Sequence, residues 1–432
     1  MTTRRSFLAS ASVALAADGG TPVRSTPLQA SYWGPQFYGP EERDLLLNVL
    51  QTQRPFRWYG PGPEPPDKVA AFESEFAARM QVSHALAVTS GTAALQCAIA
   101  SLQIGPGDEV ILPAWTWHSC YSAIVLAGAL PVFAEIDESF NLDPADIESK
   151  ITPRTKLIMA VHLQGAPCDM DRILAIARRR SIMVLEDCAQ SVGAGYKGKP
   201  LGSLGDIAIY SLQINKTISA GEGGAVLTNH PALFERAARF HDLGGLRAPH
   251  EKKLGRAQLT PFPAANFRMS EFTGAVMLAQ LRKLDRIINS TRAHATRVHD
   301  AISDLPNLKT RLRHDPAGDI GAAVFLGFDS KSRRDSFLAL MKAENVPARP
   351  PSGSVILPIQ PYIESKVTLH PQWPSFTTPH GRAIRYGAQS CPRTIDILNR
   401  YAGVSIDPKF TRRDIDDIIA AIRKTHPAAI KS

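Results

Sequence analysis

The chain has 432 residues, of which 44% are hydrophobic and 21% are charged, and its formal net charge is +9. This is the composition of an ordinary globular protein long enough for two domains, and no apolar run reaches the roughly 20 residues that cross a bilayer. Because the basic residues are spread over many segments without a nucleic-acid motif, we expect neither a nucleic-acid nor a membrane partner.

The first 30 residues form an N-terminal tail in this interpretation. Thr3-Arg4-Arg5-Ser6-Phe7-Leu8 and the alanine-rich stretch 9–17 are typical of a twin-arginine export signal, with a basic tail as the alternative. The five cysteines have no CxxC spacing, so they indicate reduced thiols rather than a zinc site or a disulfide framework. We therefore expect a cytoplasmic protein, with export as the alternative.

The first strand pattern, at 85–89, leads into an anion-binding turn. Ser90-Gly91-Thr92 follows it and opens an apolar helical stretch at 93–100. A strand, a small polar turn and a helix start present free N–H groups and a favourable dipole to an anion, which predicts a phosphate cradle. Ser-Gly-Thr is also the sequence of an ordinary helix cap.

A tryptophan pair follows the second strand pattern, at 108–112. Trp115 and Trp117 lie in the segment 113–118. Either indole could stack on a planar cofactor or pack in the core, and we favour Trp117 for stacking.

A lysine and an acid in the middle of the chain predict an aldehyde cofactor. Asp187 ends the strand-like run 182–187, and Lys216 lies a short way downstream. A pyridoxal enzyme needs a neutral amine to form an imine with the aldehyde, and a carboxylate to keep the pyridine nitrogen protonated. Gln190 is placed to meet a ring substituent. Taken singly, Lys216 could be a solvated loop lysine and Asp187 a turn former.

Strand patterns alternate with helical ones over the first 230 residues. The strands are expected at 85–89, 108–112, 130–135, 156–161, 182–187, 207–211 and 225–228. With helices such as Met170–Arg180 between them, they predict an α/β domain with a mostly parallel central sheet. The turn 221–224 is no GxGxxG fingerprint, which argues against a nicotinamide oxidoreductase. Its glycines would let the next strand pass close to the cofactor loop.

The C-terminal third has a different character. A helical pattern runs from Ser270 toward Leu305, and the proline-rich segment 347–374 predicts loops. Thr411 and Asp414 form a capping pattern for a helix at 412–423. We predict a tail at 1–30, a large domain at 31–285 and a small C-terminal α/β domain at 286–432.

Five motifs stand out along the chain, namely Ser90-Gly91-Thr92-Ala93-Ala94-Leu95, Gly107-Asp108-Glu109-Val110-Ile111, Glu186-Asp187-Cys188-Ala189-Gln190, Lys216 with Ala220-Gly221-Glu222-Gly223-Gly224, and Asn266-Phe267-Arg268-Met269. They occur in the order found in the DegT/DnrJ/EryC1/StrS aminotransferases, and the chain resembles that family over roughly residues 17–425. The resemblance implies the type I, aspartate-aminotransferase-like fold, pyridoxal 5'-phosphate as cofactor, and a homodimer with active sites at the subunit interface.

The resemblance also implies roles on the ring side of the cofactor. Lys216 would form the imine and carry the proton between the substrate and cofactor carbons. Asp187 would hold the pyridine nitrogen, Gln190 would lie near the ring hydroxyl, and Trp117 would stack on the ring. His162 falls on a motif near the cofactor and is either a site residue or a structural histidine.

On the phosphate side, the resemblance implies that Gly91, Thr92 and Ser211 bind the phosphate. Asn266 would complete this site from the partner subunit.

The implied reaction is a transamination in two halves. An amino acid, glutamate or glutamine by family habit, would load the cofactor, which would then aminate a keto group on a sugar, cyclitol or related ring. The segment from Gln213 to 224 resembles inosose aminotransferases and 3-amino-5-hydroxybenzoate synthase more than nucleotide-sugar enzymes. Ser405-Ile406-Asp407-Pro408 replaces a region that is usually more apolar, which leaves the acceptor open.

Two other functions stay open. A pyridoxal-phosphate-dependent sugar dehydratase would carry histidine in place of Lys216, so this lysine argues against it. A non-enzymatic sensor that binds the cofactor is the other alternative, and no effector module is visible in the sequence.

Overall fold

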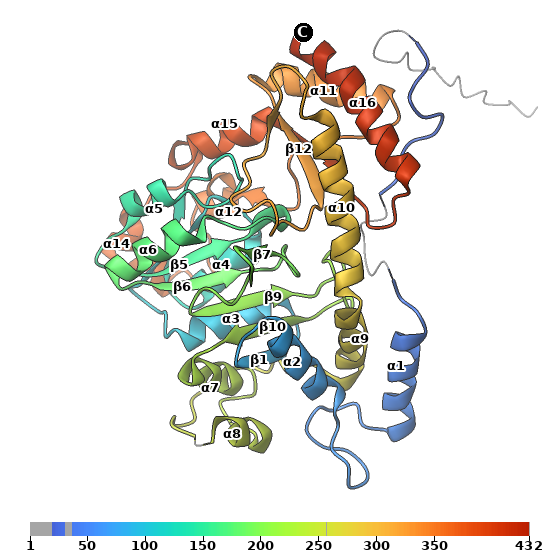
Figure 1. Ribbon diagram of the computed structural model, residues 1–432. Coiled ribbons are helices and arrows are strands. Elements are labelled where there is room, and N and C mark those ends of the chain that lie inside the picture. The colour runs from blue at the N-terminus through green and yellow to red at the C-terminus, as the bar shows by residue number, and fades with distance from the viewer. Residues whose placement is uncertain (1–19, 31–36, 256, 432) are drawn as a thin grey trace, which may run out of the picture.

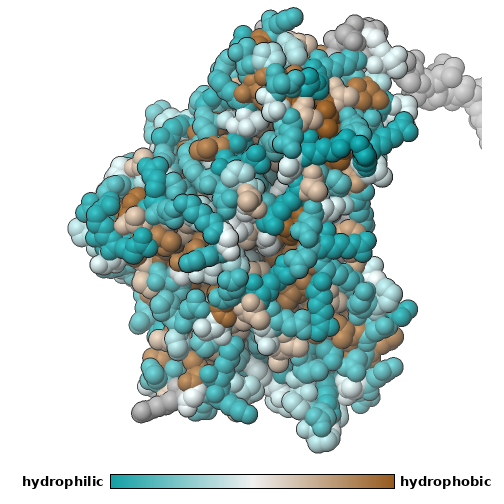
Figure 2. All heavy atoms as spheres, in the orientation of Figure 1, coloured by the Kyte–Doolittle hydropathy of each residue, from teal (hydrophilic) through white to brown (hydrophobic). Residues whose placement is uncertain are grey.

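The computed structural model describes residues 20–30, 37–255 and 257–431. The predicted export signal, in the first 17 residues, lies outside these ranges. Within them, none of the helices combines the length and the apolar character that a membrane span requires. The face of the molecule in Figure 2 is mostly hydrophilic, and its apolar residues form small separate groups.

A seven-stranded sheet forms the centre of the large domain, in the order β1-β10-β9-β6-β5-β2-β4 (Figure 1). Its strands are β1 (His84–Val88), β10 (Gly224–Thr228), β9 (Ile207–Ser211), β6 (Met183–Asp187), β5 (Thr155–Val161), β2 (Glu109–Pro113) and β4 (Leu130–Ala134). The five strands from β9 to β4 are parallel, while β10 is antiparallel to both of its neighbours. The predicted strands and the mostly parallel sheet are confirmed.

Helices cover both faces of this sheet, because successive residues of a strand point to opposite sides. One face carries α3 (Gly91–Ser101), α4 (His118–Leu126) and α7 (Pro231–Phe240). The other carries α2 (Lys68–Arg79), α5 (Pro144–Lys150), α6 (Met170–Arg180) and α9 (Glu271–Arg282). Leu112 and Ile209 belong to the first of these two cores, and Ile111 and Ile158 belong to the second. The strands are therefore buried on both sides, and polar groups reach ligands at the strand ends.

Several short elements surround this centre. They are α1 (Pro40–Thr52), β3 (Trp115–Thr116), η1 (Leu163–Gly165), β7 (Gly195–Tyr196), β8 (Lys199–Pro200) and α8 (Ala248–Leu254).

The helix α10 (Leu284–Ile302) leads from the large domain into a smaller one (Figure 1). The helical pattern that begins at Ser270 forms two helices, because the helix is interrupted at Lys283 between α9 and α10. An antiparallel sheet of β11 (Lys309–Thr310), β12 (Ala323–Gly327) and β14 (Tyr401–Ser405) forms the small domain together with α11 (Lys331–Ala343) and α16 (Arg412–Lys431). This is the smaller C-terminal α/β domain that the sequence predicted.

The last helix begins where its capping pattern predicted. The N–H of Asp414 donates to Oγ1 of Thr411 at 3.2 Å, and the N–H of Thr411 donates to the Asp414 carboxylate at 2.9 Å. The helix continues through Pro427, beyond the predicted end at 423.

The proline-rich segment after α11 returns to the large domain. The strand β13 (Val355–Ile356) pairs with β3, and Leu357 and Ile363 are buried in the large-domain core. The short helices within this segment, or between it and β14, are η2 (Leu357–Ile359), α12 (Pro361–Glu364), α13 (Pro374–Thr377), α14 (Pro379–Ala383), η3 (Ala388–Ser390) and α15 (Pro392–Arg400). The prediction of irregular loops missed this burial, because the apolar residues stand singly between prolines and polar residues and show no period.

Candidate active site

A cavity of about 520 Å³ lies between the large-domain sheet and the small domain. Such a volume is in the range of small-molecule sites. Seven of the eight predicted site residues line it, namely Gly91, Thr92, Trp117, Asp187, Gln190, Ser211 and Lys216. Small-domain strands contribute Phe325, Gly403 and Ser405, and the segment after α11 contributes Arg349. The sequence therefore identified the large-domain half of the lining, and it missed the small-domain half.

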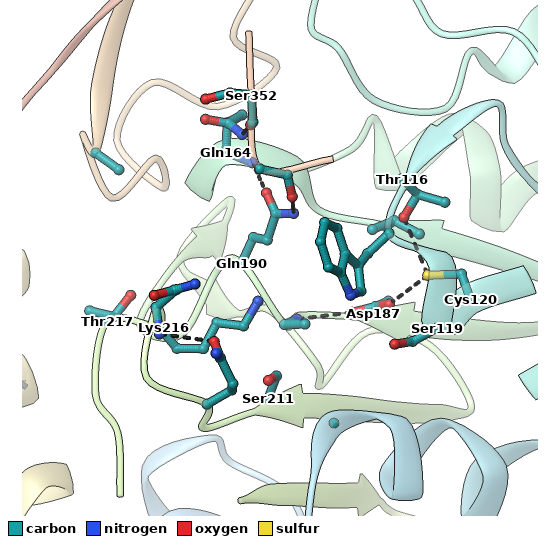
Figure 3. Close-up of a pocket in the computed structure, with 18 of the residues that line it drawn as sticks. Thr116, Ser119, Cys120, Gln164, Asp187, Gln190, Ser211, Lys216, Thr217 and Ser352 are labelled. Carbon is teal, nitrogen blue, oxygen red and sulfur yellow. Dashed lines mark hydrogen bonds between the residues drawn. The ribbon is translucent and has the colours of Figure 1, made fainter. Parts of the chain in front are cut away.

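Lys216 lies in the turn between β9 and β10 (Figure 3). Its own N–H donates to the carbonyl of Gln213 at 2.9 Å, and its amine has no hydrogen-bond partner within the part of the chain that the structure describes. Burial lowers the pKa of the Lys216 amine, although the carboxylates of Asp187 and Glu222 act in the opposite direction. The neutral, nucleophilic amine is therefore more available here than on an exposed lysine.

Asp187 ends β6 at the bottom of the cavity and is 3% exposed. Its carboxylate accepts hydrogen bonds from the N–H of Ala189 at 2.9 Å and from the thiol of Cys120 at 3.2 Å. Burial raises the pKa of Asp187 in spite of both bonds, and among the described residues no basic side chain forms an ion pair with it. A cationic ring N–H placed against this carboxylate would supply the charge that it lacks.

The turn before α3 has the geometry of an anion cradle. Oγ of Ser90 accepts from the N–H of Ala93 at 3.1 Å, which leaves the N–H groups of Gly91 and Thr92 without a partner in the described ranges. Ser211 faces this turn so closely that a Cβ on Gly91 would lie 2.7 Å from its Cβ. Free N–H groups, a helix dipole and a hydroxyl group meet here, which suits a phosphate.

The glycine-rich turn keeps β10 close to this cradle. A Cβ on Gly224 would lie 2.3 Å from the carbonyl oxygen of Ser90, so a side chain at this position would displace the turn. The predicted close approach of this strand to the cofactor loop is confirmed.

The two tryptophans have different environments. Trp115 is 2% exposed and packs edge-on against Phe140, whereas Trp117 is 51% exposed and lines the cavity. The core-packing interpretation therefore holds for Trp115, and Trp117 is the indole available to a planar ligand.

Gln190 lines the cavity, but its amide already has partners. Its Oε1 accepts from the N–H of Gln164 at 3.0 Å, and its Nε2 donates to the carbonyl of Gly353 at 3.1 Å and to Oγ of Ser354 at 3.0 Å. The Gln164 side chain donates to the carbonyl of Ser352 (Figure 3). Two glutamines thus fasten the segment 352–354, here called the strap, to the large domain. The role of Gln190 near the ring hydroxyl stays a prediction.

Asn266 does not line the cavity of its own chain. It is exposed, and it forms an isolated bridge with Asp242. The expected role of Asn266 in the partner's site is untested by a single chain and stays a prediction.

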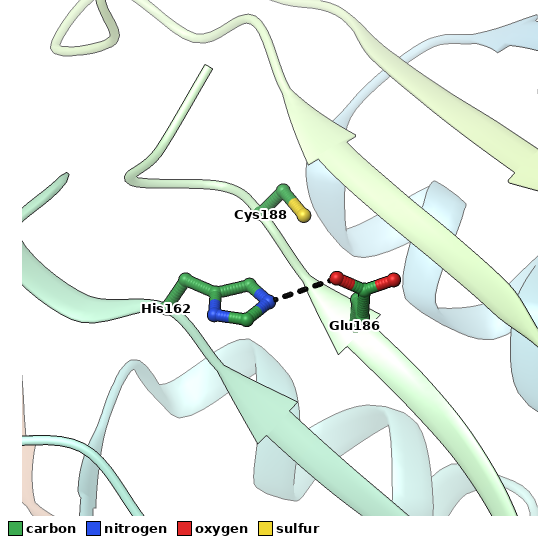
Figure 4. A group of neighbouring side chains, drawn as sticks. All are labelled: His162, Glu186 and Cys188. Carbon is green, nitrogen blue, oxygen red and sulfur yellow. Dashed lines mark hydrogen bonds and ion pairs between the residues drawn. The ribbon is translucent and has the colours of Figure 1, made fainter. Parts of the chain in front are cut away.

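His162 lies in a buried cluster with Glu186 and Cys188 (Figure 4). Its Nδ1 accepts from the N–H of Cys168 at 3.1 Å, so its Nε2 carries the hydrogen and donates to Glu186 at 3.2 Å. Glu186 accepts three further bonds, from the N–H groups of Gly202, Leu204 and Gly205. Although burial acts the other way, these bonds hold the pKa of Glu186 below its usual value.

This cluster supports the site from behind. The histidine and glutamate atoms that would ligate a metal are occupied by protein hydrogen bonds, and His162 is absent from the cavity lining. The main-chain N–H of His162 donates to the carbonyl of Asp187 at 3.0 Å. Of the two interpretations of His162, the structural one therefore holds.

The sequence profile of the DegT/DnrJ/EryC1/StrS aminotransferase family matches residues 58–423. The chain belongs to this family. It is a pyridoxal-phosphate-dependent aminotransferase with the aspartate-aminotransferase-like fold, and the residues around the cavity fit this cofactor. A buried amine, a buried carboxylate without a counter-ion and a phosphate cradle are the groups that the cofactor requires.

Three known proteins illustrate the similarity. The chain is 32% identical over 393 residues to the spore coat polysaccharide biosynthesis protein SpsC of Bacillus subtilis (strain 168), covering 89% of this chain and 94% of that protein. It is 33% identical over 376 residues to the L-glutamine:2-deoxy-scyllo-inosose aminotransferase of Streptomyces kanamyceticus, covering 83% and 85%. The crystal structure of 3-amino-5-hydroxybenzoic acid synthase aligns with a TM-score of 0.74 at 27% identity, covering 94% of this chain and all of that one.

Proposed function

We propose that this enzyme moves the amino group of an amino acid, glutamate or glutamine, to a keto group on a sugar, cyclitol or related ring. The observation that carries the proposal is that the amine of Lys216, the carboxylate of Asp187 and the free N–H groups of the α3 turn all face one cavity. The names of two relatives support the substrate class. One name joins L-glutamine to an inosose, which is a cyclitol ketone, and the other refers to polysaccharide biosynthesis.

Each large-domain side chain has a task in this proposal. Pyridoxal phosphate, when bound, supplies an aldehyde that reacts with amines and a ring that withdraws electrons from the substrate carbon. Asp187 holds the ring nitrogen in its protonated form, and Trp117 covers one face of the ring. Gly91, Thr92 and Ser211 bind the phosphate, and Gln190 lies beside the ring hydroxyl.

Lys216 has two tasks in this proposal. Its amine would hold the cofactor between turnovers. When it is not bound to the cofactor, the neutral amine would be the general base that accepts the proton from the donor's α-carbon. The lowered pKa of Lys216 supports this use, because a base must be unprotonated near neutral pH.

We also propose a homodimer in which Asn266 completes the phosphate site of the partner subunit. The surface around Asn266 supports this, because Leu243 is 62% exposed and Tyr59 is 68% exposed. Both adjoin the ion pair between Arg247 and Asp242, and Asp242 bridges to Asn266. Mixing inactive Lys216→Ala and Asn266→Ala chains tests it, since a mixed dimer keeps one intact site and regains activity. Without regained activity, the shared site is wrong.

We also propose a cellular location for the protein and a boundary between its two domains. Five free cysteines, all buried, support a cytoplasmic location, where thiols stay reduced. We propose a domain division between residues 285 and 286, supported by the change of core from the central sheet to the small sheet along α10.

The absorbance spectrum of the purified holoenzyme tests the proposed function. We expect a visible band from the lysine-bound cofactor, which bleaches with glutamate or glutamine and returns when a keto-ring acceptor is added. A band that is equally stable in Lys216→Ala contradicts the assignment. Bleaching without recovery over a panel of inosose and keto-sugar acceptors favours the sensor function.

A further inference from the structure

A buried arginine of the small domain reaches into the large domain. Arg311 follows β11, where its N–H donates to the carbonyl of Phe325 on β12 at 3.2 Å, and it is 5% exposed. Its Nε donates to the carbonyl of Ser139 at 2.7 Å, its Nη2 to that of Leu163 at 2.7 Å and its Nη1 to that of Gln164 at 3.3 Å. The guanidinium therefore joins the small sheet to three main-chain carbonyls of the large domain.

These carbonyl bonds stand where an ion pair would be expected. Among the described residues no carboxylate forms an ion pair with Arg311, and burial lowers the pKa of its guanidinium to about 10, although Asp319 and Asp137 act in the opposite direction. The group keeps its charge at neutral pH, and it lies 5.0 Å from the ring centre of Phe140 and 5.8 Å from that of Phe325. A lysine could not replace it, because only the planar fork of a guanidinium reaches several carbonyls in different directions.

The target of Arg311 is the turn η1, which contains a residue with a left-handed backbone. Gln164 has φ 54° and ψ 30°, a conformation that residues other than glycine, asparagine and aspartate rarely adopt. Besides the two bonds from Arg311, the N–H of Ile320 donates to the carbonyl of Gly165 at 3.0 Å. The small domain therefore holds all three carbonyls of the turn, and such support is what keeps an unfavourable backbone conformation in place.

The left-handed bend directs Gln164 toward the strap (Figure 3). Its N–H donates to Oε1 of Gln190 at 3.0 Å, and its side chain donates to the carbonyl of Ser352. Gln190 in turn donates to the strap through its Nε2. Ser352 and Gly353 line the cavity, whereas Arg311 does not. A residue outside the cavity thus stands behind the two glutamines that fasten its strap.

We propose that Arg311 is a positioning residue for substrate binding: by holding η1 it fixes Gln164, and through Gln164 it fixes the strap that lines the cavity. The inference rests on the proposed function, because it makes the strap a wall against which the substrates are held. Without the bonds from Arg311, the strap would have to be ordered anew each time a substrate binds, and this ordering costs affinity. Lys216 keeps its place in the turn between β9 and β10, so the chemical step changes little.

The test compares variants of the holoenzyme in hydrogen exchange and in single-turnover bleaching by glutamine. Arg311→Lys keeps the charge, and Arg311→Met keeps an apolar side chain of similar length without a buried charge, so the pair covers the case in which one of them fails to fold. In both variants we expect exchange of the amides in 355–357, which follow the strap, to quicken roughly 10-fold. The glutamine concentration that gives half-maximal bleaching should rise roughly 10-fold, while the maximal rate stays within about 2-fold of the wild type.

Arg334→Lys is the matched control. Arg334 is also a small-domain arginine, it is 4% exposed, and its Nε donates to the neighbouring Asp335 at 2.7 Å instead of to the large domain. We expect wild-type exchange at 355–357 and wild-type half-saturation in this variant.

Gln164→Ala shows whether Arg311 acts through the turn. This variant should reproduce both changes, and adding Arg311→Lys to it should increase neither of them. Effects that add in the double variant overturn the inference, and so does wild-type exchange at 355–357 in an Arg311 variant that folds. Failure of both Arg311 variants to fold would make Arg311 a purely structural residue and overturns it as well. Faster exchange in the Arg311 variants of an enzyme that no amine bleaches supports the hold on the strap and contradicts the proposed function.

Discussion

The thiol of Cys120 donates a hydrogen bond of 3.2 Å to the carboxylate of Asp187. Burial and the neighbouring carboxylate raise the pKa of Cys120 well above its usual value, so the group stays a thiol and keeps its hydrogen. A residue on α4 thereby orients the acid at the end of β6, and the carboxylate that we propose for cofactor binding depends on a cysteine that the sequence offers no reason to select.

Cys120→Ala should weaken cofactor binding. It removes one of the two hydrogen bonds that favour the charged form of Asp187, so the pKa of this carboxyl rises further above its usual range and it holds a cationic ring less well. We expect the dissociation constant for pyridoxal phosphate, measured by fluorescence titration of the apoenzyme, to rise about 3- to 10-fold. Cys120→Ser keeps a donor and should bind nearly as wild type, and Cys391→Ala is a control in the same core. Equal affinity in the Ala and Ser variants contradicts the role of this bond.

Gly91→Ala should close the phosphate cradle. The new Cβ would lie 2.7 Å from Cβ and 3.0 Å from Oγ of Ser211, so either the turn or β9 must move. We expect the purified variant to contain less than about a tenth of the wild-type cofactor, since a shift of this size breaks several short hydrogen bonds to one phosphate. Gly105→Ala is the control, because its Cβ meets only a carbonyl oxygen at 3.9 Å. Full cofactor content in Gly91→Ala means that the phosphate binds elsewhere.

Acid should destabilise the protein through His250. Burial, helped by Arg57, His241 and Lys253, lowers the pKa of His250 to about 3, and neither ring nitrogen has a partner in the described ranges. An unfolded histidine binds its proton below about pH 6.5, whereas the folded one stays neutral down to about 3. The unfolded state therefore takes up more protons as the pH falls through this window, and stability is lost.

The substitution His250→Leu should remove this loss of folding stability at acidic pH. Between about pH 6.5 and 5, the free energy of unfolding of the wild type should fall by about 2 kcal/mol more than that of the variant. Urea unfolding at the two pH values measures the difference. His230→Leu, at an exposed position, should follow the wild type. An identical pH slope in His250→Leu would show that another group carries the acid sensitivity.

Gln190→Glu should release the strap. A glutamate still accepts from the N–H of Gln164, but it cannot donate to Gly353 and Ser354. We expect hydrogen exchange of the amides in 355–357, which follow the strap and bond to the large domain, to quicken roughly 10-fold, as for the loss of one or two hydrogen bonds. Gln372→Glu, at an exposed position, should leave exchange unchanged. Unchanged exchange in Gln190→Glu would show that other contacts hold the strap.

Local patterns predicted the large-domain half of the site well. The strands β6 and β9 are apolar runs that end in Asp187 and Ser211, and their parallel pairing brings these two residues to the same edge of the sheet. The phosphate turn and Trp117 follow their strands directly, so short motifs were sufficient to find them. The α/β class, the sheet and the capping of α16 follow from the same local rules.

These local rules could not predict the small-domain half of the site. Gln190 meets Gly353 across 163 residues of chain, and Arg349 meets Ser405 across 56. Neither pair forms a motif, because the contacts depend on how the segment after α11 packs back onto the large domain. Asn266 is a third case, since its predicted role depends on a second chain.

The reversed strand β10 has a consequence for the history of such enzymes. It places the lysine-bearing turn and the phosphate turn on one framework of main-chain bonds, while Phe325, Gly403 and Ser405 reach the same cavity from a separate three-stranded sheet. Substitutions on that small sheet can therefore reshape the cavity without breaking the main-chain bonds that join the two turns.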